Sequence, residues 1–275
     1  DTYISATPFG FLRMALLPTE KTAFDEFDEG CLLYTKDKMT SKLQFSSIKF
    51  INNNINLIKD NESWQAGFAE TLIYQVDLDS GYSGNPLEMN MWSNVTFNNV
   101  PIRNLCPVKY ADEIRSDKMF LLSNRNFDMS NDTFFVVEIT GKQDDPATTI
   151  NIDTRITDVP YGAPANAEDG PNGFLQTNDA RVLDAIIIDD QIQFVGNTRN
   201  HNTNFVDVYH GIIDDAFDSK SLRGQYLGNV DYNLAYPGIA WTGTTFSDKD
   251  VIIMATHSYT DKLPGITAAY FDNSE

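Results

Sequence analysis

Apolar and polar residues alternate along several short segments of this chain. The clearest runs are Leu72–Leu78, Phe134–Ile139 and Gln191–Phe194, in which every second residue is Leu, Tyr, Val, Ile or Phe. Successive side chains of a β-strand point to opposite faces of the sheet, so this period of two predicts half-buried strands. In the last run, Gln191 and Gln193 are the polar positions between Ile and Phe.

A longer pattern recurs along the chain: a strand, a short acidic turn, a second strand, a polar hairpin and a third strand. The part after the turn has three clear copies and one weaker copy, which are Asp117–Thr140, Asp190–Ile213, Asp250–Asn273 and, less closely, Glu29–Asn52. The strand before each turn lies in Val100–Tyr110, Ala180–Ile188, Tyr236–Phe246 and, for the weaker copy, Pro8–Pro18. Repetition of one such unit predicts a propeller, a solenoid or another array. We therefore predict an all-β, β-propeller-like repeat domain, with a large β-sandwich as the alternative.

The segments outside the repeat are few. Asp144–Gly173 is rich in Pro, Gly and Asn and predicts a long loop inserted between strands. Asn61–Leu72 and Asp214–Leu222 favour short helices. No linker divides the chain, so we expect a single domain over residues 1–275. The first residue is Asp1 rather than Met, and we expect the chain to be part of a longer protein.

Composition and charge exclude several classes of partner. The chain has 20 Lys and Arg against 39 Asp and Glu, a formal net charge of −19. A field of this sign repels nucleic acid and anionic membranes, both of which need cationic side chains to neutralise phosphate. No run approaches the ~20 apolar residues that span a bilayer, so membrane insertion is not expected. The cysteines, Cys31 and Cys106, form no metal-binding pattern, and two buried thiols are the simplest interpretation.

One acidic turn has part of a calcium-binding pattern. Asp77, Asp79 and Gly81 form the D-x-D-x-G start of a calcium loop, although the match to an EF-hand is incomplete. Calcium takes six to eight oxygen ligands, many of them carboxylates. Asp77 and Asp79 are therefore candidate calcium ligands, and no other cofactor is predicted. The alternative is a solvated turn in an acidic protein.

Trp92 is the candidate ligand-binding aromatic residue. It lies between Asn-rich turns in the segment NPLEMNMWSN, where an exposed indole ring can stack on a ligand such as a sugar. Core packing is the alternative for Trp92, and it is favoured for Trp241, which lies inside a repeat strand.

Enzyme motifs are weak. Gly81–Gly84 lacks the second glycine of a nucleophile elbow at the required position, which favours a turn. His201, His210 and His257 lie in different segments and form no metal motif, although they could meet at a propeller axis. Glu138 interrupts an apolar strand and could serve as one of the two carboxylates of a glycosidase; a solvated strand face is the alternative.

The C-terminal third resembles a known group of proteins. The segment Asn178–Asp214, with Tyr236–Gly243 and His257–Asn273, is similar to large secreted surface proteins of the Bacteroidota with propeller-like repeats, many of which end in a type IX secretion sorting domain. The resemblance implies an extracellular or cell-surface protein that contacts the outer-membrane secretion machinery during export. It implies no catalytic residues.

These observations together predict a non-enzymatic adhesion or ligand-binding module that contacts a glycan or a surface protein through its rim loops. Two alternatives stay open. One is a carbohydrate-active enzyme with carboxylates at a propeller axis, and the other is a structural spacer within a longer surface protein.

Overall fold

The computed structural model describes residues 2–6, 12–16, 30–36, 42–50, 68–77, 89–111, 118–169, 173–218, 221–228, 231–245, 247–259 and 264–272. These residues form β-strands, joined by turns and loops, and no helix among them is long and apolar enough to cross a membrane. The predicted all-β class is confirmed. The strands form several sheets, none of which closes on itself, an arrangement consistent with a β-sandwich-like class.

The chain divides into two compact units. Unit 1 comprises Asp1–Arg103 and Gly141–Thr148, and unit 2 comprises Asn104–Thr140 and Thr149–Glu275. The prediction of one domain stays a prediction, because compact units of this kind also occur within single domains.

Unit 1 is built around a six-stranded antiparallel sheet in chain order, β1-β2-β3-β4-β5-β6, with a small β7–β8 hairpin beside it in the sequence. The strands are β1 Thr2–Ala6, β2 Leu12–Leu16, β3 Gly30–Lys36, β4 Lys42–Phe50, β5 Phe68–Asp77, β6 Met89–Trp92, β7 Thr96–Phe97 and β8 Val100–Pro101. Side chains tie β5 to the segments that follow it. The Thr71 hydroxyl donates to the Ile102 carbonyl at 2.7 Å, and the Gln75 amide donates to the Gly141 carbonyl at 3.0 Å.

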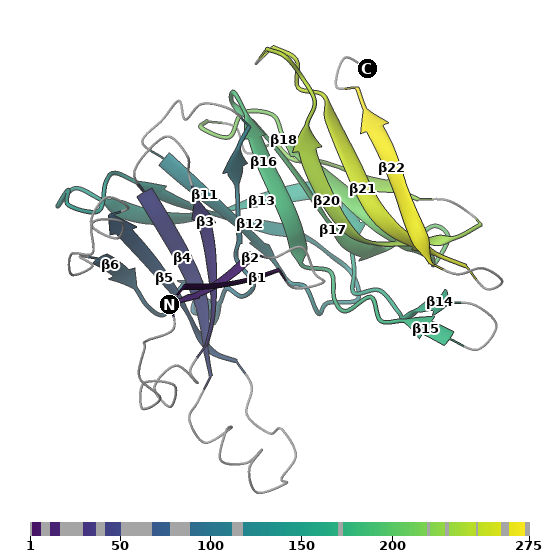
Figure 1. The fold of residues 1–275 in the computed structure, drawn as a ribbon, viewed down its shortest axis with the longest axis horizontal. Helices are drawn as coiled ribbons and strands as arrows, with labels where there is room; N and C mark the ends of the chain where they lie inside the picture. Colours follow the sequence, from purple (N-terminus) through teal and green to yellow (C-terminus); the bar gives the residue numbers. More distant parts are fainter. Residues whose placement is uncertain are drawn as a thin grey trace, which may run out of the picture. The chain divides into compact units, whose positions relative to one another are not determined.

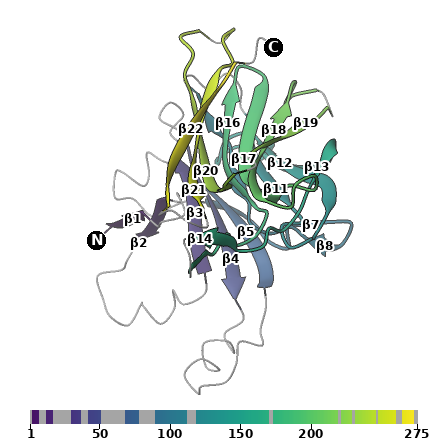
Figure 2. The same cartoon turned by 90° about the vertical axis from the view of Figure 1, so that its right-hand side faces the viewer.

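Unit 2 contains three larger sheets, β13-β12-β11-β9, β10-β16-β17-β18-β19 and β20-β21-β22, and the β14–β15 hairpin (Figures 1 and 2). The first group of strands is β9 Cys106–Pro107, β10 Lys109–Tyr110, β11 Lys118–Asn124, β12 Asn131–Thr140, β13 Thr149–Tyr161, β14 Ala167–Asp169 and β15 Gly173–Leu175. The second group is β16 Val182–Ile188, β17 Gln191–Arg199, β18 Val206–Ile213, β19 Arg223–Leu227, β20 Asn233–Trp241, β21 Val251–Ser258 and β22 Gly265–Phe271.

The strands β16, β17 and β18 are buried on both faces of their sheet. Phe194 and Tyr209 pack with Phe134 of β12 in one core cluster, and their rings lie 4.9–6.2 Å apart. On the opposite face, Val195 and Val208 belong to a second cluster with residues of β20 and β21. Three layers of sheet in unit 2 therefore share two apolar interfaces.

The strand pairing is compatible with the predicted repeat. In each copy a leading strand pairs with the first strand of an antiparallel hairpin; the sets are β2-β3-β4, β9-β11-β12, β16-β17-β18 and β20-β21-β22. The acidic turn is clearest between β16 and β17, where Ile188 faces Gln191 across a two-residue turn and Asp189 has a positive φ of 58°. Asp tolerates this left-handed conformation better than most residues, which explains its place there.

Three local predictions were wrong. Asp144–Gly173 is not a long loop, because it contains the 13-residue strand β13, which pairs along β12. Phe68–Leu72, the end of one predicted helix, belongs to strand β5. The described part of Asp214–Leu222 forms a turn rather than a helix.

Candidate functional site

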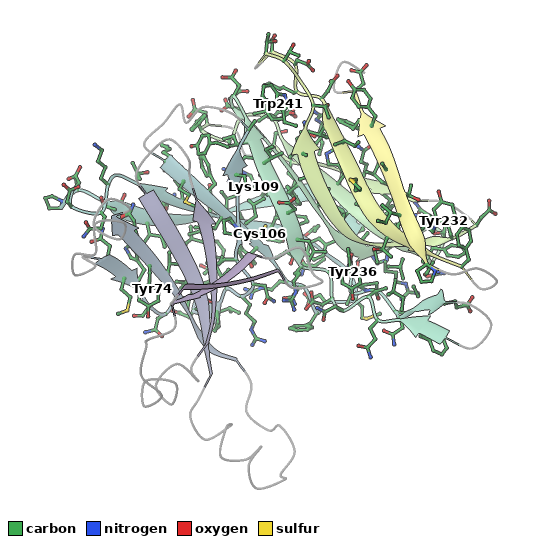
Figure 3. The ribbon with its side chains drawn as sticks, viewed as in Figure 1. Tyr74, Cys106, Lys109, Tyr232, Tyr236 and Trp241 are labelled. Atoms are coloured by element: carbon green, nitrogen blue, oxygen red, sulfur yellow. The ribbon has the colours of Figure 1, made fainter. Side chains whose placement is uncertain are left out.

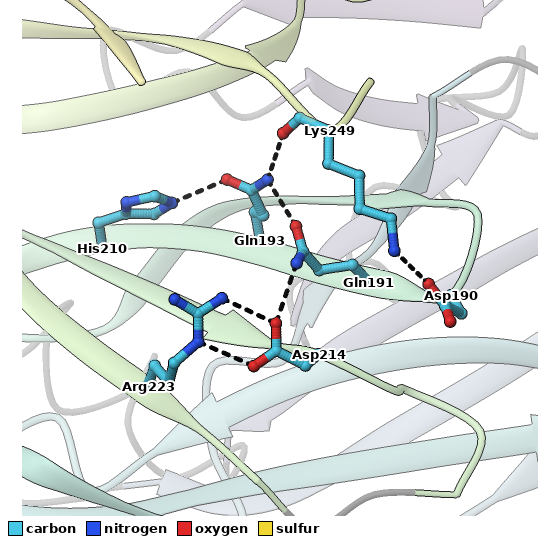
Figure 4. Close-up of polar contacts among 7 residues, drawn as sticks. All are labelled: Asp190, Gln191, Gln193, His210, Asp214, Arg223 and Lys249. Carbon is cyan, nitrogen blue, oxygen red and sulfur yellow. Dashed lines mark hydrogen bonds and ion pairs between the residues drawn. The ribbon is translucent and has the colours of Figure 1, made fainter. Parts of the chain in front are cut away.

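A polar cluster lies between β16–β19 and β20–β22, at the N-terminal end of β17 (Figure 4). Alternate positions of β17, β18 and β19 supply most of it, because residues two apart along a strand face the same side. We call it the network end; it comprises Asp190, Gln191, Gln193, His210, Asp214, Arg223, Gln225 and Lys249. Gln191, Gln193 and His210 are buried, so β17 is not the half-buried strand that its alternation predicts.

His210 is held between two amides. Its Nε2 lies 3.0 Å from the Gln193 Oε1, and the Gln225 amide nitrogen lies 2.9 Å from its Nδ1. Both contacts are satisfied at once when Nε2 carries the proton and Nδ1 accepts. Burial, and secondarily the charge of Arg223, lowers the pKa of His210 to about 3. The imidazole is therefore neutral at physiological pH and its edge packs against the Phe271 ring, with centroids 4.7 Å apart.

The network continues from Gln193 to the surface. The Gln193 amide donates to Gln191 Oε1 at 2.9 Å and to the Lys249 carbonyl at 2.7 Å. Gln191 in turn donates to Asp214 at 3.0 Å, and Asp214 accepts two hydrogen bonds from Arg223 at 2.8 Å each. The hydrogen bonds from Arg223 lower the pKa of Asp214.

The network end has the character of a structural cluster. The polar side-chain atoms of Gln193 and His210 form hydrogen bonds with other protein groups. The pKa of His210, about 3, is far below the value near 7 that suits acid–base catalysis. Fully satisfied buried networks of this kind fix how strands and layers register against each other.

The opposite end of the same sheets is formed by loops. We call it the loop end, and it comprises residues 125–130, 162–166, 176–181 and 197–205. Backbone hydrogen bonds join these segments: Ala163 donates to Asp128, Ala180 to Asn126, and Arg199 to Gly162, at 2.8–2.9 Å. The loops of two neighbouring hairpins and the connections around β14–β15 are thus tied into one piece.

Asparagine and aspartate side chains strengthen the loop end. Asn126 donates to Asp179 at 2.8 Å, and Asp179 also receives the guanidinium of Arg181 at 2.5–2.7 Å. Asn197 donates to the Thr177 carbonyl and accepts from the Tyr236 amide, both at 2.6 Å. Figure 3 shows Tyr236 near the start of β20 and Trp241 at its far end. Buried amides and carboxylates with such partners hold loops in a single conformation.

Two apolar side chains project from this framework into solvent. Phe127 is 62% exposed and Met129 is 59% exposed, and both lie in the β11–β12 loop. Between them, Asp128 accepts from Ala163 through its carbonyl and from Asn131 through its carboxylate. Exposed aromatic and Met side chains on a fixed loop are typical of interaction surfaces.

Asp207 is an unusual residue beside the loop end. Its side chain is buried; Oδ2 accepts from Asn200 at 2.6 Å, and Oδ1 has no partner among the described residues. Burial raises the pKa of Asp207, against the hydrogen bond from Asn200. A side chain at Gly228 would collide with the carboxylate. His201 Nε2, in the neighbouring hairpin loop, is likewise buried and has no hydrogen-bond partner in the part of the chain that is described.

The site residues predicted from sequence are described only in part. Trp92 ends β6, opposite Ile73, and is half-buried; its role in binding stays a prediction. Asp77 ends β5, but its side chain and all of Asp79 lie outside the described residues. In the part of the chain that is described, no three His, Cys, Asp or Glu side chains gather in a way that could hold a metal ion.

Several other candidates have structural partners. Glu138 pairs with Lys118 at 3.1 Å and lies on a partly exposed strand face. Trp241 packs against the core and donates its indole N–H to the Asp248 carbonyl at 2.7 Å, so the predicted core role is confirmed. Cys106 is a buried free thiol, whose pKa is raised by burial. Figure 3 shows it in the same part of unit 2 as Lys109, which pairs with Asp184.

Comparisons with protein-family models, with curated proteins and with solved structures find no match to this chain.

Proposed function

We propose that this protein is a non-enzymatic adhesion or ligand-binding module whose binding surface is the loop end. The observation that carries the proposal is the combination of a hydrogen-bonded loop framework with the exposed side chains of Phe127 and Met129. A surface that is ordered before binding loses little conformational entropy on association, so a few contacts suffice for useful affinity.

The chemistry of the loop end fits a glycan or a protein surface. Phe127 offers a flat apolar ring for stacking, and Arg125, Arg181 and Arg199 lie in the same loops of an otherwise acidic chain. The Arg125 guanidinium stands 4.7 Å from the Phe135 ring, and Arg181 is held by Asp179. Fixed arginines beside an aromatic ring are common anchors in binding surfaces.

A binding panel tests this proposal. Immobilised bacterial and host polysaccharides and surface proteins would be screened with the wild-type chain. The variant Phe127→Ala, alone and with Met129→Ala, is expected to weaken any binding about tenfold, because loss of an anchor costs 1–2 kcal/mol. Ile156→Ala, at an exposed residue of β13 outside the loop end, is the matched control. Equal loss in the control, or binding that survives both loop changes, would contradict the proposal.

The same panel distinguishes a binding module from a carbohydrate-active enzyme. Release of reducing sugar from a polysaccharide, abolished by changing a single carboxylate, would replace the binding module by a carbohydrate-active enzyme. Absence of both binding and turnover would favour a spacer module. Trp92 and the candidate calcium ligands Asp77 and Asp79 are tested separately. Binding by the Trp92→Ala variant is measured in the same panel, and thermal melting with and without a chelator tests for bound calcium.

We further propose a location outside the cell, as cargo of the type IX secretion system. The resemblance of Asn178–Asp214 and the following segments to secreted Bacteroidota surface proteins supports this. Fractionation of cells that make the protein, with and without a working secretion system, tests it. Retention in the cytoplasm of cells with a working system would overturn it.

A propeller-like arrangement of the repeats is also proposed. In unit 2, sheets that follow each other in the chain pack face to face, as successive blades do. An electron-microscopy map with the sheets arranged around a common axis would support it, whereas a simple stack of layers would make the protein a β-sandwich.

A further inference from the structure

The sheet β20-β21-β22 has one apolar face in the core and a second apolar face in solvent. Ile239, Val251 and Ile253 are buried against the sheet of β16–β19. The alternate residues of β21, among them Met254, point the other way, and Ile266 and Tyr270 of β22 lie beside them in register. On this outer face Met254 is 47% exposed, Ile266 71% and Tyr270 63%. Figures 1 and 2 show β22 at the margin of this layer.

Within the described part of the chain, β22 is also the edge strand of its sheet. Among the described residues it pairs only with β21, whereas the corresponding strands β12 and β18 are each covered by a further strand, β13 and β19. Edge strands are usually blunted by charged residues or Pro. The seven residues of β22, GITAAYF, contain neither, although the chain has 39 acidic residues.

The sequence of β22 is complementary to itself in the antiparallel direction. If two copies face each other at Ala268, Ile266 of one copy lies opposite Tyr270 of the other, on the exposed face. Thr267 then lies opposite Ala269, and Gly265 opposite Phe271. The small Ala268 side chains at the axis leave room for the two flanking pairs, and pairs of an aromatic and a β-branched side chain stabilise antiparallel strands.

We propose that two copies of this chain associate through β22, which pairs with its symmetry mate about a two-fold axis at Ala268. The contact is isologous, as most dimer contacts are, and it joins two three-stranded sheets into one six-stranded sheet. It lies in β22, outside the loop end, and does not depend on the proposed ligand-binding function.

Charge within β22 does not oppose this pairing, and the net charge of the chain predicts a salt dependence. No charged residue lies within the paired strands, and Asp272 of one copy lies opposite Pro264 of the other. The two Asp272 residues are eight strand positions apart, about 27 Å, so they hardly repel each other. The net charge of −19 still opposes association over long range. Dimerisation should therefore strengthen as salt screens that repulsion.

Cysteine cross-linking tests the register. In the Ala268→Cys variant the two new thiols face each other with Cα atoms about 5 Å apart, within disulfide reach. Mild oxidation should give a covalent dimer on a non-reducing gel. In the matched control Ile266→Cys, on the same strand face, the two Cα atoms are about 14 Å apart, too far for a bond. Equal cross-linking of both variants, or of neither, would overturn the proposed register.

Charge variants test the edge itself. By sedimentation velocity, wild type should show a monomer–dimer equilibrium that shifts toward dimer with added salt. Ala268→Lys places two ammonium groups at the axis and should weaken the dimer at least tenfold. Met254→Lys puts the same charge on the same face, opposite Ala268 but one strand inward, and should retain the dimer. A monomeric wild type, or equal loss in both variants, would overturn pairing through β22.

Discussion

At the scale of single residues, the interior of unit 2 contains two titratable side chains whose neutral forms are both favoured but whose pKa values move in opposite directions. His210 is buried and both ring nitrogens have amide partners, so its neutral form is stabilised. Asp207 is buried, and one of its oxygens has no partner among the described residues, so its charged form is destabilised. Burial disfavours the charged form of either group, and it therefore lowers the pKa of His210 and raises that of Asp207.

His210 should make stability depend on pH. Its folded pKa of about 3 lies below the unfolded value near 6.5, so between these values the unfolded chain binds more protons. Stability from this group is complete above pH 6.5 and falls as pH decreases toward 3. Between pH 7 and pH 5 the loss should be about 2 kcal/mol.

Urea unfolding of wild type and His210→Gln at both pH values measures this. The variant lacks the titrating ring, and its free energy of unfolding should decrease by about 2 kcal/mol less between pH 7 and pH 5. Carboxylates contribute equally to both proteins and cancel in the comparison. An unchanged pH dependence in the variant would show that His210 is protonated, or accessible to protons, in the folded protein.

Asp207 makes stability depend on pH in the opposite direction. Its folded pKa is raised, so over the range between the unfolded and folded values the folded chain binds more protons, and stability falls as pH rises through that range. Asp207→Asn removes the buried charge and should stabilise the protein at pH 7 by about 1 kcal/mol, as measured by urea unfolding. The gain should vanish at pH 3. A destabilised variant at pH 7 would show that the carboxylate has a partner, such as a bound cation or water.

At the scale of elements, β17 and β18 fit together through a large residue that faces a small one. Phe194 faces Gly211 across the two strands, and its ring covers the glycine: an added Cβ at Gly211 would lie 2.1 Å from the ring. Glycine is needed here because no larger residue leaves room for the buried ring. The pair helps to set the register of the hairpin, since a shift by one residue would place the ring against a side chain.

Gly211→Ala should destabilise the protein by about 2 kcal/mol through overpacking. In a Phe194→Leu background the same change should cost about 1 kcal/mol less, because the shorter side chain leaves space. Urea unfolding of the four proteins of this cycle gives the coupling. Gly238→Ala is the control: its Cβ would come no closer than 3.8 Å to any non-neighbouring heavy atom, so it should cost much less. Additive effects at Gly211 and Phe194 would contradict the argument.

The elements also show what the sequence could predict. Turn residues and alternation identify the hairpins β11–β12, β17–β18 and β21–β22, because local geometry determines them. The strand β13 was missed, since the Pro- and Gly-rich stretch after it obscured the alternating Ile residues at its start.

The network end could not be predicted. Gln191 and Gln193 have the pattern of a solvated face, and only the packing of β20–β22 above them reveals their burial. The partners of His210 come from β17 and β19, at sequence distances that no motif spans. The loop end was anticipated only as polar hairpins; its hydrogen bonds depend on tertiary contacts.

At the scale of the whole molecule, charge and core are separated. The described core clusters consist of apolar side chains, while the net charge of −19 is carried mainly outside them. Self-repulsion of that charge favours expansion of the chain, so moderate salt should stabilise the folded state. The division into two compact units has a separate consequence. A unit that contains its complete core should fold without the rest of the chain.

The shortened chain of residues 104–275 should therefore fold by itself. Every member of the three described core clusters of unit 2 lies within it, so the apolar contacts that stabilise those sheets are retained. We expect a single cooperative urea transition that coincides by near- and far-ultraviolet circular dichroism. Ile187→Asp, which places a charge in the core, should abolish that transition in the same shortened chain. A broad transition without near-ultraviolet signal would show instead that unit 2 depends on unit 1 for its stability.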